Sequence, residues 1–186
     1  MTLAVTYLPE APAHDPEIDD INEEAFGPGR FVRAAYKIRE GGPHDRNLSF
    51  VAMHDGVVIA SVRMTWIAAG KGRALLLGPL AVRPAFKNMG IGRKLVAMAT
   101  DAARRAGAPA VLLVGDEPYY GPLGFKRIPA GQMVMPRPVD PNRFLAVELR
   151  AGAVAALIGD VQHAWQVDGM PADIQTGCAH ARASVA

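Results

Sequence analysis

A glycine turn that leads into a helical run is the first segment whose residues could bind a ligand. It reads Lys87-Asn88-Met89-Gly90-Ile91-Gly92, and Arg93 and Lys94 follow in the first helical turn. Glycines at such a junction let backbone N–H groups approach a ligand closely, and a helix N-terminus attracts anions. Cations gathered at the positive end of a helix dipole are unfavourable, and a bound polyphosphate would reverse that cost. The segment therefore predicts a phosphate site; the alternative is a tight loop whose cations are merely solvated.

Two familiar nucleotide-binding patterns are absent from this turn. A Walker loop has two glycines separated by four residues and followed by Lys and then Ser or Thr, whereas Gly92 is followed by Arg93-Lys94-Leu95. A dinucleotide fingerprint would place its first glycine directly after a strand and a third glycine at Leu95. Neither of these two conditions holds, which argues against nicotinamide and flavin cofactors. The missing Walker pattern likewise argues against a Walker-type site.

The strand expected before this turn contains a break. Residues 75–82 read Leu-Leu-Leu-Gly-Pro-Leu-Ala-Val. Pro79 cannot donate a hydrogen bond to a β-ladder, and a glycine such as Gly78 often marks a bulge. One interpretation is that the strand separates from its neighbour here and leaves the backbone of residues 80–82 free to bond an extended ligand. The other is an edge bulge with no role, and this feature alone does not decide between them.

A strong helix and a short strand must position these groups. Residues 92–106 carry apolar side chains at helical spacing, and Gly107 ends the run. Residues 110–114 form a continuous apolar run, typical of a central strand covered on both faces. With the strand over residues 73–82 they predict a β-α-β unit. The other expected elements are a strand over residues 2–8, a helix that begins at Asp15, a helix over residues 30–39, strands over residues 48–53 and 57–67 joined at Asp55-Gly56, and a last strand over residues 144–149.

Composition limits the class of protein. The 186 residues, about half of them apolar, suit one globular unit. Twenty Lys and Arg against eighteen Asp and Glu leave a formal charge of +2, far from the basic character of a nucleic-acid binder. The N-terminus lacks a basic and apolar leader, and no run approaches the roughly 18 apolar residues of a membrane span. Cys178 is the only cysteine, which argues against an internal disulfide or a cysteine-rich metal site. We expect a cytoplasmic protein without metal, membrane or nucleic-acid partners.

At the glycine turn the sequence resembles the GNAT superfamily of N-acetyltransferases. The family pattern is Gln or Arg, two residues, Gly, one residue, and Gly or Ala at the start of a helix; here Lys87 takes the first place. A second segment, Tyr119-Tyr120-Gly121-Pro122-Leu123-Gly124-Phe125, is similar to the family's Tyr-x-x-x-Gly-Phe. The resemblance covers residues 2–149 and is strongest over residues 75–125.

The resemblance implies an α/β (α+β) fold with a mixed, centrally splayed β-sheet flanked by helices, and direct transfer of an acetyl group from acetyl-CoA to an amine of a small molecule or peptide. Tyr120 takes the position of the general acid that protonates the departing thiolate, and Tyr119 is the weaker candidate. The alternative for either tyrosine is a core aromatic with a satisfied hydroxyl. The residues implied in binding CoA are Leu80, Ala81, Val82, Lys87, Asn88, Met89, Gly90, Ile91, Gly92, Arg93 and Lys94.

No residue stands out as the general base. Asp116 and Glu117 are expected near the thioester, but an Asp before Glu-Pro more often caps a helix. His54 is expected to belong to its hairpin. Three aromatic residues could line an acceptor pocket, although their spacing is more common in core packing: Phe26, Phe31 and Tyr36.

The absence of an obvious base keeps a second function open, that of a non-catalytic acyl-CoA-binding sensor or regulatory module. We expect residues 1–150 to form the acyltransferase domain. Residues 151–186, which show weak periodicity, are expected to pack on that domain or trail from it. Homodimerisation is left open.

Overall fold

The computed structural model describes residues 4–29 and 33–171 of the chain. Among these residues, no helix is long and apolar enough to cross a membrane. The strands and α-helices in chain order are β1 (Thr6–Pro9), α1 (Asp15–Phe26), α2 (Ala34–Arg39), β2 (Phe50–His54), β3 (Val57–Ala69), β4 (Gly72–Val82), α3 (Ile91–Arg105), β5 (Ala110–Val114), α4 (Glu117–Tyr120), β6 (Lys126–Arg127), β7 (Met133–Val134), β8 (Phe144–Glu148), β9 (Gly159–His163) and α5 (Trp165–Asp168).

One mixed sheet organises the chain, in the strand order β1-β2-β3-β4-β5-β8-β6. Strands β1 to β4 are antiparallel neighbours, β5 runs parallel to β4, and β8 and β6 continue the sheet in antiparallel pairs. Strand β3 is long enough to pair with β2 through residues 57–62 and with β9 through residues 67–69. Residues 159–163, in the segment without a sequence-based assignment, therefore return to the sheet.

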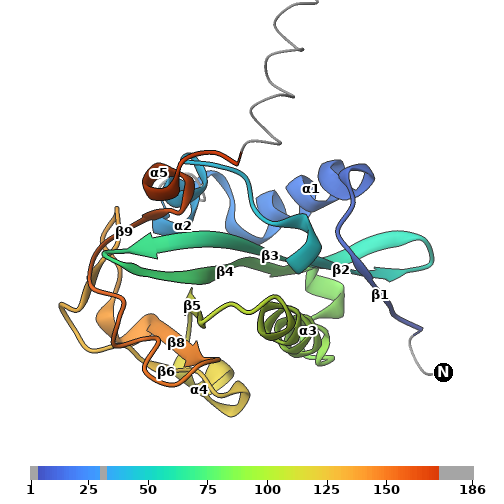
Figure 1. Cartoon of the computed structure of the whole chain (residues 1–186). Helices are drawn as coiled ribbons and strands as arrows, with labels where there is room; N and C mark the ends of the chain where they lie inside the picture. The colour runs from blue at the N-terminus through green and yellow to red at the C-terminus, as the bar shows by residue number, and fades with distance from the viewer. Residues whose placement is uncertain (1–3, 30–32, 172–186) are drawn as a thin grey trace, which may run out of the picture.

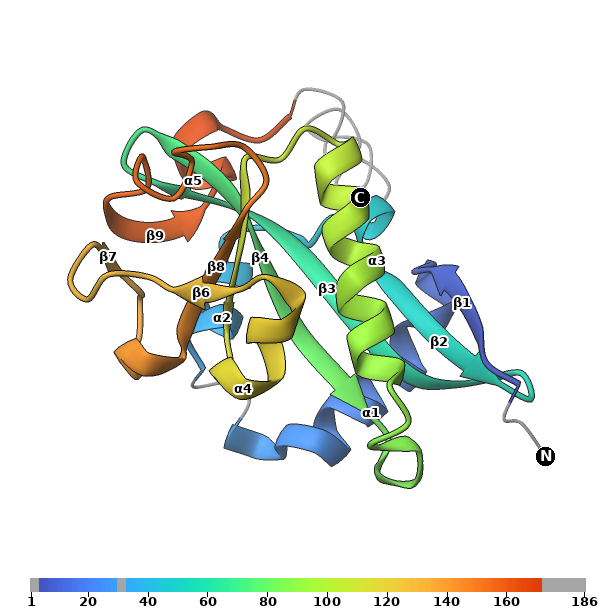
Figure 2. The same cartoon turned by 90° about the horizontal axis from the view of Figure 1, so that it is seen from below.

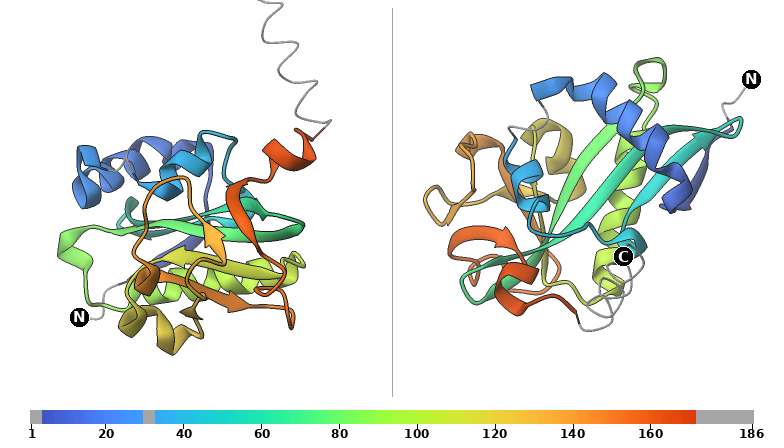
Figure 3. Two further views of the ribbon diagram at one scale, coloured as in Figure 1. Left: turned by 90° about the vertical axis from the view of Figure 1, so that its left-hand side faces the viewer. Right: turned by 90° about the horizontal axis from the view of Figure 1, so that it is seen from above.

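Helices cover both faces of this sheet. Helices α1 and α2 lie on one face and α3 on the other (Figure 1), and two further views show the same layers (Figure 3). Side chains alternate along β4, so that Leu75 and Leu77 join the core cluster of α3 while Ala74 and Leu76 join that of α2. All four side chains are at most 4% exposed. Strand β4 is thus buried on both faces.

Strands β4 and β5 separate partway along their length. They pair only through residues 75–76 of β4 and 111–112 of β5. Beyond Gly78, whose φ of 139° suits only glycine, β4 stays paired with β3 up to Val82, while the end of β5 pairs with β8. Figure 2 shows the two strands diverging toward their C-terminal ends. The predicted splayed, mixed sheet flanked by helices is confirmed.

The predicted elements differ from the structure mainly at their ends. The first strand is observed as Thr6–Pro9, and residues 2–3 of the predicted strand lie outside the described residues. The helix predicted over residues 30–39 is observed as α2 from Ala34, with residues 30–32 outside the described part. Strand β2 starts at Phe50 instead of Leu48, because Leu48 belongs to a 3-10 turn that the Asp45 side chain caps.

Candidate functional site

A cleft of about 630 Å³ lies between the open edge of β4 and the N-terminus of α3, and we call it the turn cleft. Its walls include all the residues predicted to bind CoA except Met89 and Lys94. Met89 is exposed on the turn, with 56% of its surface accessible. The predicted residues that line the turn cleft are Leu80, Ala81, Val82, Lys87, Asn88, Gly90, Ile91, Gly92 and Arg93.

The backbone of β4 presents hydrogen-bonding groups to this cleft. The N–H of Arg83 donates to the carbonyl oxygen of Ile59 on β3, at 2.9 Å. Successive residues of a strand direct their N–H and C=O groups to opposite edges, so those of Leu80 and Val82 face away from β3. Within the described part of the chain, no strand pairs with that edge of β4 beyond Leu76. The edge can therefore bond an extended ligand.

The two glycines of the turn serve different needs. Gly90 is the N-cap of α3 and has a φ of 77°, in the left-handed region that favours glycine. A Cβ atom on Gly92 would lie 2.6 Å from the hydroxyl of Tyr119. No side chain caps the first turn of α3, which leaves its N–H groups open to an anion. The guanidinium of Arg93 lies 5.3 Å from the centre of the Tyr119 ring, so the turn and Tyr119 form one wall of the cleft.

A second cavity, of about 640 Å³, adjoins the turn cleft, and we call it the central cavity. It lies between α1 and α2, the broken part of β4, the end of β5 and α4. Phe26, Leu80 and Tyr119 line both cavities, which therefore meet where the sheet splays. A ligand extended along β4 in the turn cleft would place its end at the mouth of the central cavity.

Tyr120 lines the central cavity. Its ring meets the rings of Tyr119 and Phe125 edge-on, with centroids 4.7 and 5.9 Å apart. It also covers Gly115, where a Cβ atom would lie 2.2 Å from the Tyr120 ring. Burial, and next the neighbouring Tyr119 and Asp116, raise the pKa of the Tyr120 phenol to about 12. The phenol is thus protonated at neutral pH, as a general acid must be, and its catalytic role stays a prediction.

The carboxylates weighed as a general base are both held by arginines. Asp116 lines the central cavity, and its Oδ1 lies 3.0 Å from Nε of Arg143. It takes the N-cap position of α4, but its side chain makes no capping hydrogen bond, so the predicted cap is present in position only. Glu117 accepts a hydrogen bond of 2.6 Å from Nε of Arg127. Across residues 4–29 and 33–171, no three His, Cys, Asp or Glu side chains converge as a metal site.

The structure places the remaining candidates in different surroundings. Phe26 and Tyr36 line the central cavity, as an acceptor pocket requires. Phe31 and Cys178 lie outside the described residues. His54 lies at the end of β2, where its Nδ1 is 2.8 Å from the carbonyl oxygen of Ala4, and it lines neither cavity.

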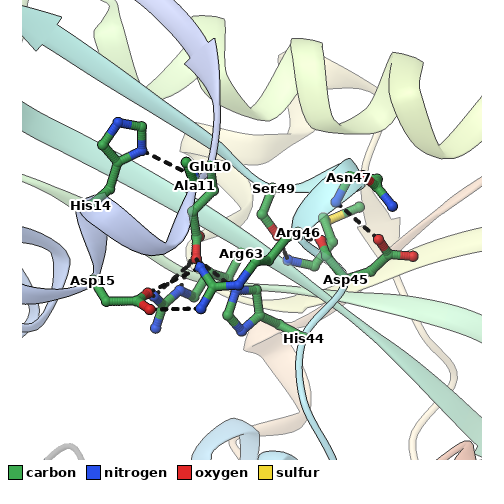
Figure 4. A network of polar contacts seen from close by, with 11 residues as sticks. Glu10, Ala11, His14, Asp15, His44, Asp45, Arg46, Asn47, Ser49 and Arg63 are labelled. Atoms are coloured by element: carbon green, nitrogen blue, oxygen red, sulfur yellow. Dashed lines mark hydrogen bonds and ion pairs between the residues drawn. The ribbon is translucent and has the colours of Figure 1, made fainter. Parts of the chain in front are cut away.

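A network of polar side chains around the buried Glu10 borders the central cavity, and it consists of Glu10, Asp15, His44, Arg46 and Arg63 (Figure 4). Arg63 lines the cavity and donates to Glu10 through Nε and Nη2, both at 3.0 Å. Arg46 joins Glu10 to Asp15, and Nε2 of His44 lies 2.7 Å from Glu10. Burial alone would raise the pKa of Glu10, but hydrogen bonds with His44 and Arg63 outweigh it and hold the pKa below its ordinary value. Glu10 is therefore an ionised structural group.

Sequence reasoning missed the four arginines that line the central cavity, Arg33, Arg39, Arg63 and Arg143. Arg63 lies within the apolar run of β3, at the point where its register with β4 shifts. A charged residue in a buried strand was the available signal. Arg39 carries no such signal, because a cation in the last turn of a short helix is ordinary.

The comparisons with known proteins agree with this geometry. Residues 16–125 match the model of the acetyltransferase (GNAT) family. An uncharacterized N-acetyltransferase of Escherichia coli strain K12, YjhQ, is 28% identical over 127 residues, which are 66% of this chain and 69% of the relative. The structure of the E. coli GNAT family N-acetyltransferase YhbS in complex with CoA superposes with a TM-score of 0.74 at 24% identity, covering 90% of this chain and 94% of the other. A GNAT family acetyltransferase from Brucella melitensis in complex with acetyl-CoA gives a TM-score of 0.59 at 27% identity, over 79% and 89% of the two chains.

Proposed function

The chain belongs to the acetyltransferase (GNAT) family, and we propose that the turn cleft and the central cavity are the two halves of its active site. It is an N-acetyltransferase, which transfers the acetyl group of acetyl-CoA to an amine. The observation that carries the site proposal is the splay of β4 from β5, which opens a strand edge beside a helix N-terminus. The CoA and acetyl-CoA bound by the two solved relatives support acetyl-CoA as the ligand of the turn cleft.

In this proposal the turn cleft binds CoA. Backbone N–H groups of Gly90, Gly92 and their neighbours hold the pyrophosphate, because the first turn of α3 is uncapped and its dipole favours an anion. Arg93 adds a positive charge at the same wall. The outward groups of Leu80 and Val82 bond the pantetheine arm, which fixes the thioester where the two cavities meet.

The central cavity then admits the amine to the thioester. The nitrogen forms a bond to the carbonyl carbon, and the negative charge that develops on the oxygen is stabilised by an N–H group of the splayed strand. As the C–S bond breaks, the Tyr120 hydroxyl gives its proton to the departing sulfur, and the proton that the nitrogen loses on becoming an amide returns to the Tyr120 phenolate. Most of the rate enhancement comes from holding the two reactants in this geometry.

A direct experiment tests the function. Isothermal calorimetry should detect acetyl-CoA binding, and a thiol reagent should detect CoA release only when an accepted amine is present. A non-catalytic sensor, which family membership does not favour, would bind acetyl-CoA and release no CoA with any member of a broad amine panel. Failure to bind any CoA species would reject the assignment of the turn cleft.

Arg93 and Lys94 provide a matched test of the phosphate site. Arg93 lines the turn cleft and Lys94 does not, although both are exposed cations of the first helical turn. We expect Arg93→Gln to weaken acetyl-CoA binding by about two- to fivefold and to flatten its salt dependence, since an exposed charge interaction contributes roughly 0.2–1 kcal/mol. Lys94→Gln should change the calorimetric Kd less. Equal effects of the two variants would place the phosphates away from the Arg93 wall.

Three further assignments stay predictions. They are the cytoplasmic location, homodimerisation, and the division of the chain at residue 150 into an acyltransferase domain and an extension.

A further inference from the structure

Arg39 brings an unmatched positive charge to the wall of the central cavity. Its Nη1 donates to the carbonyl oxygen of Gly78 at 3.0 Å, and its guanidinium lies 5.5 Å from the centre of the Tyr36 ring. Among the described residues, no carboxylate lies within 4.0 Å of this guanidinium. A guanidinium has five N–H donors, so most of those of Arg39 are open to a ligand.

The neighbouring charges do not neutralise Arg39. Arg63, whose positive charge acts on Arg39, donates hydrogen bonds to Glu10 and Asp15. Both carboxylates also bind Arg46, so two carboxylates balance two guanidinium groups. Burial, and next the positive charge of Arg63, lower the pKa of Arg39 to about 10. Arg39 is still protonated at neutral pH, and the negative charge of an anion in the cavity would offset both effects.

A second polar group of the same cavity also lacks a partner. Asn22 on α1 lines the central cavity and is 7% exposed, and its Oδ1 accepts no hydrogen bond from the described residues. A buried amide oxygen without a donor is costly. The oxygen atom itself has almost no accessible surface, so a ligand N–H group would reach it only after the Asn22 side chain turns toward the cavity.

Arg39 also lies close to the site of chemistry. It binds the carbonyl of Gly78, and Gly78 is two residues from Leu80, where the turn cleft and the central cavity meet. Two residues of extended chain span at most about 7 Å. Arg39 therefore lies within on the order of 10 Å of the junction, so a carboxylate that it binds and an amine at the thioester can belong to one small molecule.

We propose that the acceptor is a small amino acid, whose carboxylate binds Arg39 while its amine lies at the junction of the two cavities. This inference rests on the acetyltransferase function and site proposed above. A protein lysine or a peptide N-terminus has no free carboxylate at this short distance from the amine. A polyamine would bring further positive charge to Arg39.

The test compares each amino acid with its primary amide, which keeps the amine and side chain and removes the negative charge. We expect the parent enzyme to prefer its best amino acid over the matching amide by at least about thirtyfold in kcat/KM, as for a desolvated charge pair. Arg39→Gln should abolish this ratio, chiefly by raising KM for the amino acid, with acetyl-CoA affinity unchanged. Arg39→Lys should keep part of it.

Arg33→Gln is the matched control, because Arg33 lines the same cavity but lies over the Phe26 ring, 4.5 Å from its centre, and is exposed. It should keep the amino acid to amide ratio. A parent enzyme that acetylates amides as well as amino acids would overturn the proposal. So would an Arg39→Gln variant that keeps the ratio.

A binding experiment tests the inference separately from turnover. Calorimetry on the complex of the enzyme with CoA compares N-acetyl amino acids with the corresponding N-acetyl amides. The N-acetyl amino acids should bind at least about thirtyfold more tightly, and Arg39→Gln should remove the difference. Equal or undetectable binding of both sets rejects the amino acid site even if acetyl-CoA binds. Conversely, if the N-acetyl amino acids bind selectively but no amine leads to release of CoA, only the proposed turnover is rejected.

Discussion

Replacing Tyr120 with Phe is expected to lower kcat by about ten- to a hundredfold and to leave acetyl-CoA affinity unchanged. A positioned general acid contributes about a hundredfold or more, but a thiolate leaves more easily than an alkoxide, which lowers the expectation. The hydroxyl is needed only as the C–S bond breaks, so its loss should appear in kcat rather than in the calorimetric Kd. Steady-state kinetics with an accepted amine measure the effect.

Tyr119→Phe is the control for this variant. It removes the hydroxyl that lies against Gly92 and keeps the ring edge-on to Tyr120, so it should change kcat much less. Equal losses in the two variants, or none in Tyr120→Phe, would return Tyr120 to the role of a buried aromatic side chain.

The raised pKa of Tyr120 predicts the alkaline side of the pH profile. A general acid must be protonated, and a phenol with a pKa of about 12 stays protonated far above neutral pH. The kcat of the parent enzyme should therefore show no fall that depends on Tyr120 up to about pH 10. An alkaline fall near pH 8 or 9 that disappears in Tyr120→Phe would contradict this assignment.

The part of the fold that forms the turn cleft could be predicted from the sequence, because the signals for its elements are local. Helix α3 and strand β5 follow the predicted residues within one position at each end, since their apolar periodicity and Gly107 are read within a short window. The break at Gly78-Pro79 is also local, but it left a splay and an edge bulge equally open, and the resemblance to the family implied the splay. The resemblance to the family then assigned a role to each part of that region.

The acceptor side could not be predicted in the same way, because its groups come from distant segments. Arg39 on α2, Asn22 on α1 and Arg63 on β3 meet only after the helices cover the sheet. Strand β9 was missed for another reason. Its outward positions are polar and its buried positions are Val161 and His163, so it lacks the alternating apolar pattern of a strand.

Glu10 shows most clearly what the sequence leaves out. It stands between Pro9 and Ala11 and looks like an ordinary loop carboxylate. Its partners His44, Arg46 and Arg63 follow 34 to 53 residues later. In the structure its side chain is fully buried, with 0% exposure, and it accepts hydrogen bonds from Arg46 and Arg63. Its negative charge matters because it compensates the positive charges of Arg46 and Arg63.

Glu10→Gln is therefore expected to lower the free energy of unfolding by about 3–5 kcal/mol, since removing one member of a buried ion pair leaves the other uncompensated. For a chain of this size the melting temperature should fall by on the order of 10 °C. Asp15→Asn is the control: the Asp15 side chain is 36% exposed, so water can replace part of what it loses, and the melting temperature should fall less.

The dependence on pH gives the same prediction an independent check. The folded-state pKa of Glu10 lies below its ordinary value, so its contribution is present at neutral pH and is lost as the pH falls through that lowered pKa. Chemical denaturation of the parent and Glu10→Gln should show their largest difference near pH 7 and a smaller one in acid. A Glu10→Gln variant within about 1 kcal/mol of the parent at pH 7 would mean that solvent, rather than Glu10, balances Arg46 and Arg63.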